Sequence, residues 1–394
     1  MSRNITKGCP QGSCSGPGYW NIQYNSLLNL KFSNNTKIIA FADDLLVLTR
    51  GKNPTEAEIY MNMEMQKIAK WSQNNKMQFN AQKSKVMLVS RRRKWTGERI
   101  SIYLNGKTIE QTDEIKYLGI LVDNHFHFSK HINHVAEKAI KIVYALSRYA
   151  KLNWGLGSQA LETIYKGAIL PVMAYGAPIW FSPAMTKETN RRKYKRVQRL
   201  INIKIAKAYR TISYEASCTL VGETPIIIKL QEIVSMYTSL SESADTTMDR
   251  KIIKREIAAK TKVESMLKWE EEWRNTEKGA ITKSFFPTIE ERLKQKLQHT
   301  PNMTIILTGH GKINSYFYRF KIKESPMCIC GKSSQTVEHI IYECEELQEE
   351  RNALIRKTTL GGTTWPIEES SLVREHLSAI SDFVQSIDFE ELTQ

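Results

Sequence analysis

Residues 37–48 have the sequence KIIAFADDLLVL, which places Asp43 and Asp44 between two short apolar runs. This pattern predicts a tight β-hairpin that carries both carboxylates at its bend. Two ionised carboxylates beside apolar strands are costly unless something compensates their charge. A hard cation such as Mg²⁺, bound through oxygen ligands, is the usual compensation. For these residues alone, a plain Asp-Asp turn explains the pattern equally well.

A turn rich in glycine and proline precedes the acidic pair. It contains Gly8-Cys9-Pro10-Gln11-Gly12-Ser13, followed by Gly16-Pro17. Glycine and proline hold the backbone in special conformations, and we expect a helix over about residues 19–30 after them. Such a turn before a helix can approach phosphates or a base pair closely. Together, the two motifs favour the metal site over the plain turn.

These two motifs resemble the palm of a reverse transcriptase. Residues 8–17 are similar to the motif that positions template and nucleotide, and residues 41–44 are similar to the metal-binding motif. In detail, the chain looks most like type-1 (non-LTR) retrotransposable elements, particularly the insect clade that inserts into ribosomal RNA genes. The resemblance implies an RNA-directed DNA polymerase, with an RNA template, a DNA target or primer, and deoxynucleotides as substrates.

The same resemblance implies roles for particular residues. Asp43 would be the principal ligand of two Mg²⁺ ions, with Asp44 in support. As lone residues, Tyr117 and Leu118 are more typical of a core than of a primer site. The implied template and substrate residues are Pro10, Gln11, Gly12 and Lys83, and the implied primer grip is Tyr117, Leu118 and Gly119.

The charge of the chain favours a polyanionic partner. Its 394 residues carry a net charge of +16, and its pI is near 9.4. The expected partner is nucleic acid, through phosphate contacts that do not depend on sequence. No apolar run approaches the ~18 residues that span a bilayer. Six cysteines, three of them near the C-terminus, fit a reducing compartment and a metal site better than a disulfide framework.

The pattern along the chain predicts an α+β fold. An amphipathic helix is expected at residues 54–74. Strands are expected at residues 86–89, 100–104, 108–109 and 117–122, with a turn at Asn105-Gly106. Helices are expected at residues 129–149 and 158–170, the second ending at Pro171. With the resemblance, these elements suggest a partial palm (1–123), a helical thumb with a basic helix (124–215), a helical linker (216–300) and a zinc-knuckle region (301–394).

Residues 191–210 hold nine lysines or arginines and no acid. Tyr194, Val197 and Ile201 fall on one helical face, so the basic side chains cover the rest. A solvated charged face is one interpretation. Because all nine charges share one sign, we favour a phosphate partner. The residues predicted to bind nucleic acid are Arg192, Lys195, Arg196 and Arg199.

Four potential zinc ligands cluster near the C-terminus. Cys328, Cys330, His339 and Cys344 supply three thiolates and one imidazole, a complete tetrahedral Zn²⁺ set. Buried cysteines without a ligand are the alternative, which the donor set and spacing disfavour. The surrounding residues also resemble the zinc-knuckle segment of the same retrotransposons. A complete ligand set predicts a structural or nucleic-acid-binding site rather than a hydrolytic one.

His125, His127, His131 and His134 suggest a second metal site at first sight, but their alternation with phenylalanines favours packing. Reverse transcriptases use a third carboxylate from a strand upstream of the Pro-Gln-Gly motif, whereas residues 1–42 contain no Asp or Glu. We therefore expect the parent polyprotein, with an endonuclease domain upstream, to be the polymerase, and this chain alone to be inactive. The alternative is a non-catalytic nucleic-acid-binding protein derived from such an element. The resemblance implies a nuclear location, and the lack of a long apolar run implies no membrane partner.

Overall fold

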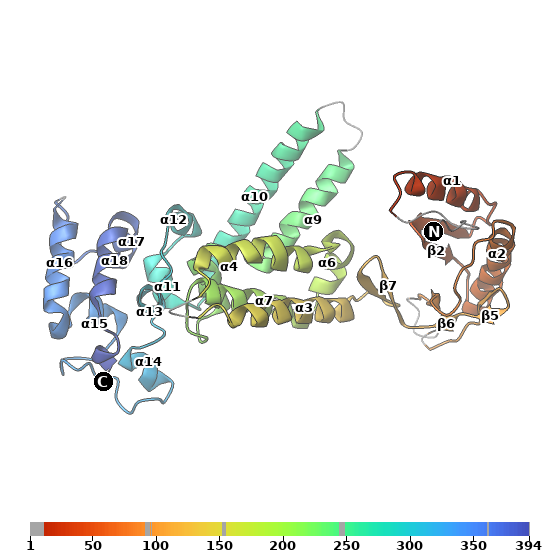
Figure 1. The fold of residues 1–394 in the computed structure, drawn as a ribbon. Helices are drawn as coiled ribbons and strands as arrows, with labels where there is room; N and C mark the ends of the chain where they lie inside the picture. Colours follow the sequence, from red (N-terminus) through yellow and green to blue (C-terminus); the bar gives the residue numbers. More distant parts are fainter. Residues whose placement is uncertain are drawn as a thin grey trace, which may run out of the picture. The chain divides into compact units, whose positions relative to one another are not determined.

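The computed structural model describes residues 12–90, 95, 97–151, 155–243, 249–360 and 362–393. The chain divides into two compact units, Met1–Phe128 and Ser129–Gln394 (Figure 1). All the named β-strands lie in the first of these units, and the second is built from helices. This helix-rich architecture with small sheets agrees with the predicted α+β class. The finer division into four regions remains a prediction.

The first unit is built around a β-hairpin covered by two helices. Strand β1 (Thr36–Phe41) pairs antiparallel with β2 (Asp44–Thr49), in a register that runs from Thr36 opposite Thr49 to Phe41 opposite Asp44. Every second residue of β1 faces inward, as alternation in a half-buried strand requires. Apolar side chains of both strands pack against a core that includes Leu27 of α1 (Gly16–Leu28) and Ile68 of α2 (Pro54–Asn74). The predicted hairpin is therefore confirmed.

Helix α2 begins where its sequence predicts. The Asn53 side chain caps the helix by accepting a hydrogen bond from the Glu56 amide at 2.8 Å. Pro54 follows in the first turn, where its missing N–H costs nothing. Ile68 and Trp71 are buried, whereas Lys70 between them is exposed. These local signals made the helix predictable.

The remaining strands of the first unit are short. The expected strand at 86–89 is reduced to β3 (Lys85–Val86), which pairs in parallel with β6 (Glu110–Gln111). The turn at Asn105-Gly106 joins β4 (Tyr103–Leu104) to β5 (Lys107–Thr108), as predicted. Both turn residues have positive φ, 50° and 75°, which is the conformation that Asn-Gly hairpin turns require.

The prediction of one strand at 117–122 is wrong. The structure has a hairpin there, with β7 (Glu114–Tyr117) paired antiparallel to β8 (Ile120–Asp123). Leu118 and Gly119 form its turn with φ of 45° and 83°. A leucine at positive φ is uncommon, so an apolar run that contains it gives no sequence signal of a turn.

The second unit opens with helices that surround the basic one. Its first part contains α3 (Ser129–Ser147), α4 (Ser158–Ile164), the π-helix η2 (Tyr165–Ile169), α5 (Leu170–Ala174), α6 (Ala177–Met185), α7 (Glu188–Ile205) and α8 (Tyr214–Val221). The predicted helix end at Pro171 is wrong, because the chain passes through η2 and continues into α5. Pro171 lies in the first turn of α5, which is the position that tolerates proline.

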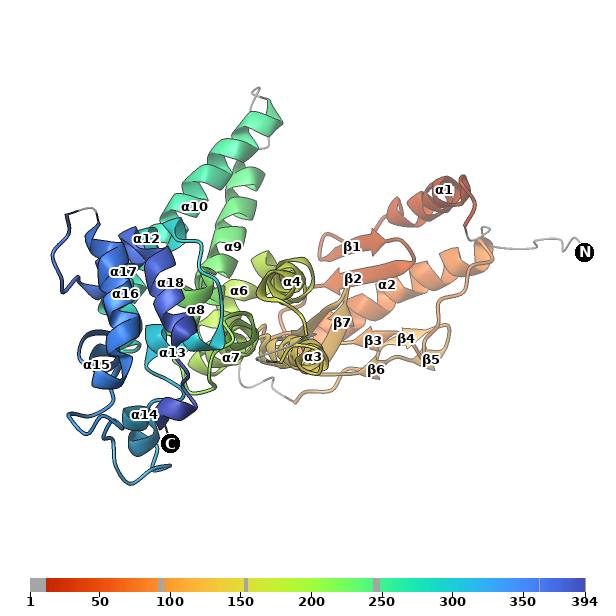
Figure 2. The same ribbon diagram turned by 60° about the vertical axis from the view of Figure 1, so that its left-hand side comes forward.

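Helices α9 (Ile226–Glu242) and α10 (Arg250–Asn275) lie side by side and extend from the second unit as an arm (Figure 2). Trp269 and Trp273 of α10 are buried in a small core with Cys218 and Ile289. The Trp273 indole also donates to the Phe286 carbonyl at 2.9 Å. Both tryptophans of α10 therefore pack on neighbouring elements of the second unit.

The C-terminal part of the second unit consists of short helices. These are α11 (Ala280–Phe285), α12 (Ile289–Lys294), α13 (Pro301–Thr308), α14 (Asn314–Arg319), α15 (Val337–Tyr342), η3 (Glu345–Leu347), α16 (Gln348–Thr359), α17 (Glu369–Glu375), α18 (Leu377–Ser386) and η4 (Glu391–Thr393). Within the described part of the chain, no single helix is long and apolar enough to cross a membrane. One bent pair, Ser158–Ala174 with Ala177–Met185, passes that test of length and composition.

Candidate metal and nucleic-acid sites

The acidic pair lies at the tip of the β1–β2 hairpin. Asp43 belongs to the turn, and Asp44 opens β2 opposite Phe41. Ala42 has a φ of 52°, which lets two residues reverse the chain. Both aspartates are exposed to solvent. The carboxylates therefore do not lie in the apolar surroundings expected from the flanking strands, and their outward position leaves them accessible to a cation.

Helix α1 holds this turn in place through backbone carbonyls. The Trp20 indole donates to the Ala42 carbonyl at 2.9 Å, and the Tyr24 hydroxyl donates to the Asp43 carbonyl at 3.5 Å. The two rings stack with centroids 5.1 Å apart. Burial raises the pKa of Tyr24 to about 12, with smaller contributions from Asp43 and Asp44. Helix α1 thus holds the backbone of the hairpin turn, while both aspartate side chains remain exposed to solvent.

The other predicted template and substrate residues are less well defined. Pro10 and Gln11 lie outside the described residues, and Gly12 is exposed with a φ of 80°. Lys83 is exposed in a turn, where its amide donates to the Asn80 side chain at 3.3 Å. Among residues that the structure describes, no third Asp, Glu, His or Cys joins the acidic pair in a metal-binding group.

The predicted primer-grip residues lie together in the β7–β8 turn. Tyr117 ends β7, and Leu118 and Gly119 form the turn itself. Tyr117 and Leu118 are half-buried, and Gly119 is exposed. They are therefore on the surface of the first unit rather than in its core.

Helix α7 presents some of its basic side chains to solvent. Arg192 and Arg196 are exposed, and Lys195 is half-buried with its ammonium group 5.5 Å from the centre of the Tyr214 ring. Arg192 forms an ion pair with Glu188 at 3.6 Å. Glu188 lies just before the acid-free stretch, so one acidic residue of the same helix partly compensates the positive charge of α7.

Arg199 differs from the other three predicted nucleic-acid-binding residues. Its Nε and Nη2 atoms donate to the Ile212 carbonyl at 2.9 and 2.8 Å, and Nη2 also donates to the Arg210 carbonyl. Its guanidinium group is therefore used to hold the chain that follows α7. The inward-facing side of the helix is apolar, with Tyr194, Val197 and Ile201 fully buried.

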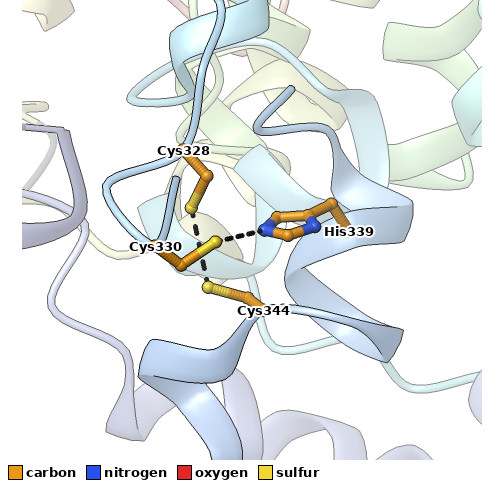
Figure 3. Close-up of side chains that lie close together, drawn as sticks. All are labelled: Cys328, Cys330, His339 and Cys344. Atoms are coloured by element: carbon orange, nitrogen blue, oxygen red, sulfur yellow. Dashed lines mark hydrogen bonds between the residues drawn. The ribbon is translucent and has the colours of Figure 1, made fainter. Parts of the chain in front are cut away.

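The C-terminal cysteines and histidine converge as predicted (Figure 3). Their four candidate ligand atoms all lie within 4.8 Å of one another. The Sγ atoms of Cys328 and Cys344 are 3.6 Å apart, and Cys330 Sγ is 3.3 Å from His339 Nε2. In a tetrahedral site with Zn–S bonds of about 2.3 Å, two sulfur atoms are roughly 3.8 Å apart. The set therefore fits a zinc ion.

Local structure brings these four side chains together. Gly331, with a φ of 71°, lets its amide turn back to the Cys328 carbonyl at 2.9 Å. His339 lies on α15, and Cys344 follows that helix with its amide bonded to the His339 carbonyl at 2.8 Å. Cys328, His339 and Cys344 are buried, and Cys330 is half-buried. No ligand position is left open among four donors.

A second layer of polar groups orients the ligands. The Nδ1 atom of His339 lies 2.8 Å from Ser333 Oγ and 3.2 Å from Glu343 Oε2, which leaves Nε2 to face Cys330. The side-chain amide of Gln335 donates to Cys328 Sγ at 3.7 Å. Such partners fix the tautomer and orientation of a metal-bound histidine. Sequence reasoning did not identify Glu343 as a partner of His339. Its position four residues after His339, at the end of a helix, is a usable signal.

The remaining histidines have other environments. His131 is buried, with its ring centroid 5.7 Å from that of Trp180, which is the packing role that its context predicts. His125 and His127 are exposed in the first unit, with ring centroids 5.7 Å apart. Their amides donate to Asp123, at 3.2 and 3.0 Å.

Residues 1–122 match the family described as "Reverse transcriptase (RNA-dependent DNA polymerase)". Several retrotransposon proteins match most of the chain. "Retrovirus-related Pol polyprotein from type-1 retrotransposable element R1 2" of Nasonia vitripennis is 27% identical, over 88% of this chain and 87% of the relative. A similarly described R1 4 protein of Nasonia vitripennis is 29% identical, over 87% of this chain and 93% of the relative. The R1 protein of Bradysia coprophila is 28% identical, over 87% of this chain but 35% of the relative.

The chain therefore contains reverse transcriptase sequence, which includes the hairpin with Asp43 and Asp44. Along most of its length it is similar to Pol polyproteins of type-1 retrotransposable elements of the R1 kind. It spans most of two Nasonia relatives and about a third of the Bradysia one.

Proposed function

We propose that this chain is the part of an RNA-directed DNA polymerase that carries a pair of catalytic carboxylates and a helical nucleic-acid-binding region. The observation that carries the proposal is the β1–β2 turn. It presents Asp43 and Asp44 to solvent while Trp20 and Tyr24 hold its backbone. The reverse transcriptase match over residues 1–122 supports this assignment.

The proposed reaction joins a primer 3′-hydroxyl to the α-phosphate of a deoxynucleotide. Mg²⁺, when bound, would lower the pKa of the attacking hydroxyl and stabilise negative charge on the phosphate. Asp43 and Asp44 would supply carboxylate oxygens, which are the ligands that Mg²⁺ prefers. Pyrophosphate leaves as the new ester bond forms. The rigid turn would keep both carboxylates in one position during repeated cycles.

The other proposed roles in the first unit follow the family resemblance. Gly12, with Pro10 and Gln11 before it, would shape the pocket for the nascent base pair, and Lys83 would contact phosphates. The turn at Tyr117, Leu118 and Gly119 would contact the primer. Residues 1–123 would then form part of the palm, and residues 124–215 the thumb.

The helical region would bind nucleic acid and zinc. Exposed Arg192 and Arg196, with Lys195 beside them, would contact phosphates of the RNA template or the DNA primer, in the nucleus of the host cell. We further propose that Cys328, Cys330, His339 and Cys344 hold one Zn²⁺ ion in the region 301–394. Four ligands complete its tetrahedron, so this ion would stabilise the fold rather than activate water.

The polymerase proposal can be tested by joining this chain behind the preceding part of the longer Bradysia coprophila relative. Mg²⁺-dependent incorporation on an RNA template should fall to background with Asp43→Asn. The matched control is Glu98→Gln, which removes an exposed negative charge elsewhere in the same unit. Full incorporation by the Asp43→Asn protein would refute the role of this residue. A polypeptide of residues 1–394 alone should not extend a primer, because two carboxylates leave both metals under-liganded.

A non-catalytic nucleic-acid-binding protein is the second candidate. It is favoured by one observation: within the described residues, the acidic pair has no third potential metal ligand beside it. This candidate predicts that the joined protein binds RNA and DNA with the affinity of the chain but incorporates no nucleotide. The two candidates therefore differ in incorporation and agree in binding.

A further inference from the structure

Large apolar side chains are exposed at the end of α14. Tyr318 is 51% exposed, Phe320 is 44% exposed and Ile322 is 63% exposed. Basic residues alternate with them, because the local sequence is Tyr318-Arg319-Phe320-Lys321-Ile322. Isolated exposed apolar groups need no explanation, but an exposed aromatic and basic cluster is typical of a binding surface.

The backbone holds these rings in fixed positions. Lys321 has a φ of 57°, and its amide bonds to the Tyr318 carbonyl at 2.9 Å. The next amide, that of Ile322, bonds to the Phe317 carbonyl at 2.8 Å. These two bonds end α14 in a tight left-handed turn. Phe320 also packs on the buried ring of Tyr316, with ring centroids 4.7 Å apart.

Arg319 lies between Tyr318 and Phe320 in the sequence, and its guanidinium group is held by contacts with His310 and Phe320. Its Nη2 atom donates to His310 Nε2 at 3.1 Å, so Nδ1 carries the proton of the neutral ring and donates to Thr211 at 2.9 Å. Its guanidinium carbon lies 5.2 Å from the centre of the Phe320 ring. Burial, and then the charge of Arg319, lowers the pKa of His310 to about 4, so this contact persists at neutral pH.

The charge of this surface is positive. Residues 310–323 contain four basic residues and no acid. Lys312 forms an ion pair with Glu390, and Lys323 donates to the Thr393 carbonyl. In the described part of the chain, neither Arg319 nor Lys321 has a carboxylate partner within ion-pair distance. Their charges are thus available to an anionic partner beside the aromatic rings.

We propose that Tyr318, Arg319, Phe320 and Lys321 form a stacking platform for single-stranded nucleic acid. This inference rests on the proposed nucleic-acid binding of the chain, and it names the form of the ligand. Base faces are accessible in a single strand, whereas a duplex keeps them stacked on one another. Tyr318 and Phe320 would each receive a base, and Arg319 and Lys321 would contact the flanking phosphates.

The experiment compares single-stranded and duplex binding by the full zinc-loaded chain. Fluorescence anisotropy is measured with a labelled uridine 20-mer and with a labelled 20-base-pair duplex. Each ring removed should weaken single-strand binding about ten-fold, so Tyr318→Ala with Phe320→Ala should weaken it about a hundred-fold. Duplex affinity should change less than about two-fold, and the salt dependence should keep its slope, because no charge is removed. Tyr318→Phe with Phe320→Tyr should bind as the original chain does.

The matched control is Tyr237→Ala, which removes a similarly exposed tyrosine (59%) from α9. Photo-crosslinking of a 5-iodouridine strand to the original chain tests the platform without any substitution, and the crosslinks should map to Tyr318 or Phe320. The inference is overturned if the double alanine variant binds single strands normally, if it loses single-strand and duplex binding equally, or if crosslinks map elsewhere. A chain that binds neither probe would instead refute the proposed nucleic-acid binding, and with it this platform.

Discussion

Arg199 donates two hydrogen bonds to the carbonyl oxygen of Ile212, at 2.9 and 2.8 Å. A third bond reaches the carbonyl of Arg210. These contacts join α7 to the chain segment that follows it. Arg199 therefore stabilises the fold of the second unit, whereas Arg192 and Arg196 of the same helix are exposed.

We predict that Arg199→Gln mainly destabilises the protein. Without Arg199 the carbonyl of the buried Ile212 loses its donors, and an unsatisfied buried acceptor typically costs about 1–3 kcal/mol, so a loss of that size in unfolding free energy is expected. Urea unfolding followed by circular dichroism measures it. Arg196→Gln is the control, because an exposed substitution should change stability by less than ~0.5 kcal/mol. Equal stability of the two variants would contradict the structural role of Arg199.

We predict that Arg192, Lys195 and Arg196 contribute to phosphate binding. Replacing all three with Gln should flatten the log–log salt dependence of duplex DNA binding by up to about 2.7, because each phosphate contact contributes about 0.9. Loss should be similar for all sequences, since phosphate contacts do not identify bases. The control replaces three exposed basic residues of α10, Lys251, Lys254 and Arg255, with Gln. An unchanged slope for the α7 variant would favour a solvated face, with residues 91–94, which lie outside the described residues, as the next candidate.

Local signals made several parts of this structure predictable. The hairpin at residues 37–48 follows from two short apolar runs around a polar pair, and the start of α2 follows from Asn53 and Pro54. The convergence of Cys328, Cys330, His339 and Cys344 follows from their donor types and short spacing. In each case, the residues that determine the structure lie close together in the sequence.

The features that sequence reasoning missed depend on distant residues or unusual backbone. Trp20 supports the turn at Ala42 through a bond between two separate elements. Leu118 adopts a positive φ that its residue type disfavours. Arg199 looks like any other basic residue in the sequence, and its carbonyl partner, Ile212, lies beyond the end of the helix. The type and position of a single residue in the sequence do not identify a partner on another element.

We predict that burial of His131 makes the second unit sensitive to acid. Burial, and then the charge of His134, lowers the pKa of His131 to about 4 from its usual value near 6.5. Between these values the unfolded chain binds more protons than the folded one. Stability is therefore lost as the pH falls from about 6.5 to 4, by at most about 1.4 kcal/mol per pH unit from this residue.

The measurement is the unfolding free energy between pH 7 and pH 5. His131→Gln should reduce the pH dependence relative to the original chain, while His134→Gln, at an exposed position, should retain most of it. His310, whose pKa is also lowered to about 4, contributes equally to all three proteins. The same pH dependence in the His131→Gln protein would exclude this residue as the source.

We predict that the chain binds one equivalent of zinc. Cys344→Ser should remove the metal, because Cys344 is a buried member of the four-ligand set. Metal analysis of the purified chain tests this, together with hydrogen exchange in α15, which carries His339. Cys14→Ser is the control, since Cys14 is an exposed free cysteine of the first unit. Unchanged zinc content after Cys344→Ser would show that this set does not hold the ion.

Glu343 should tune this site without being a ligand. Its Oε2 atom lies 3.2 Å from His339 Nδ1, so it can accept a hydrogen bond from Nδ1–H when Nε2 faces the metal. Loss of such a partner typically lowers metal affinity 10–100-fold. Ser333 also lies 2.8 Å from Nδ1 and will retain part of the orientation, so we expect Glu343→Gln to weaken zinc binding by about ten-fold. Competition with a chromophoric chelator measures the affinity, and Glu346→Gln removes a neighbouring exposed charge as the control. If Glu346→Gln weakens binding as much as Glu343→Gln, the effect is general electrostatic attraction rather than orientation of His339.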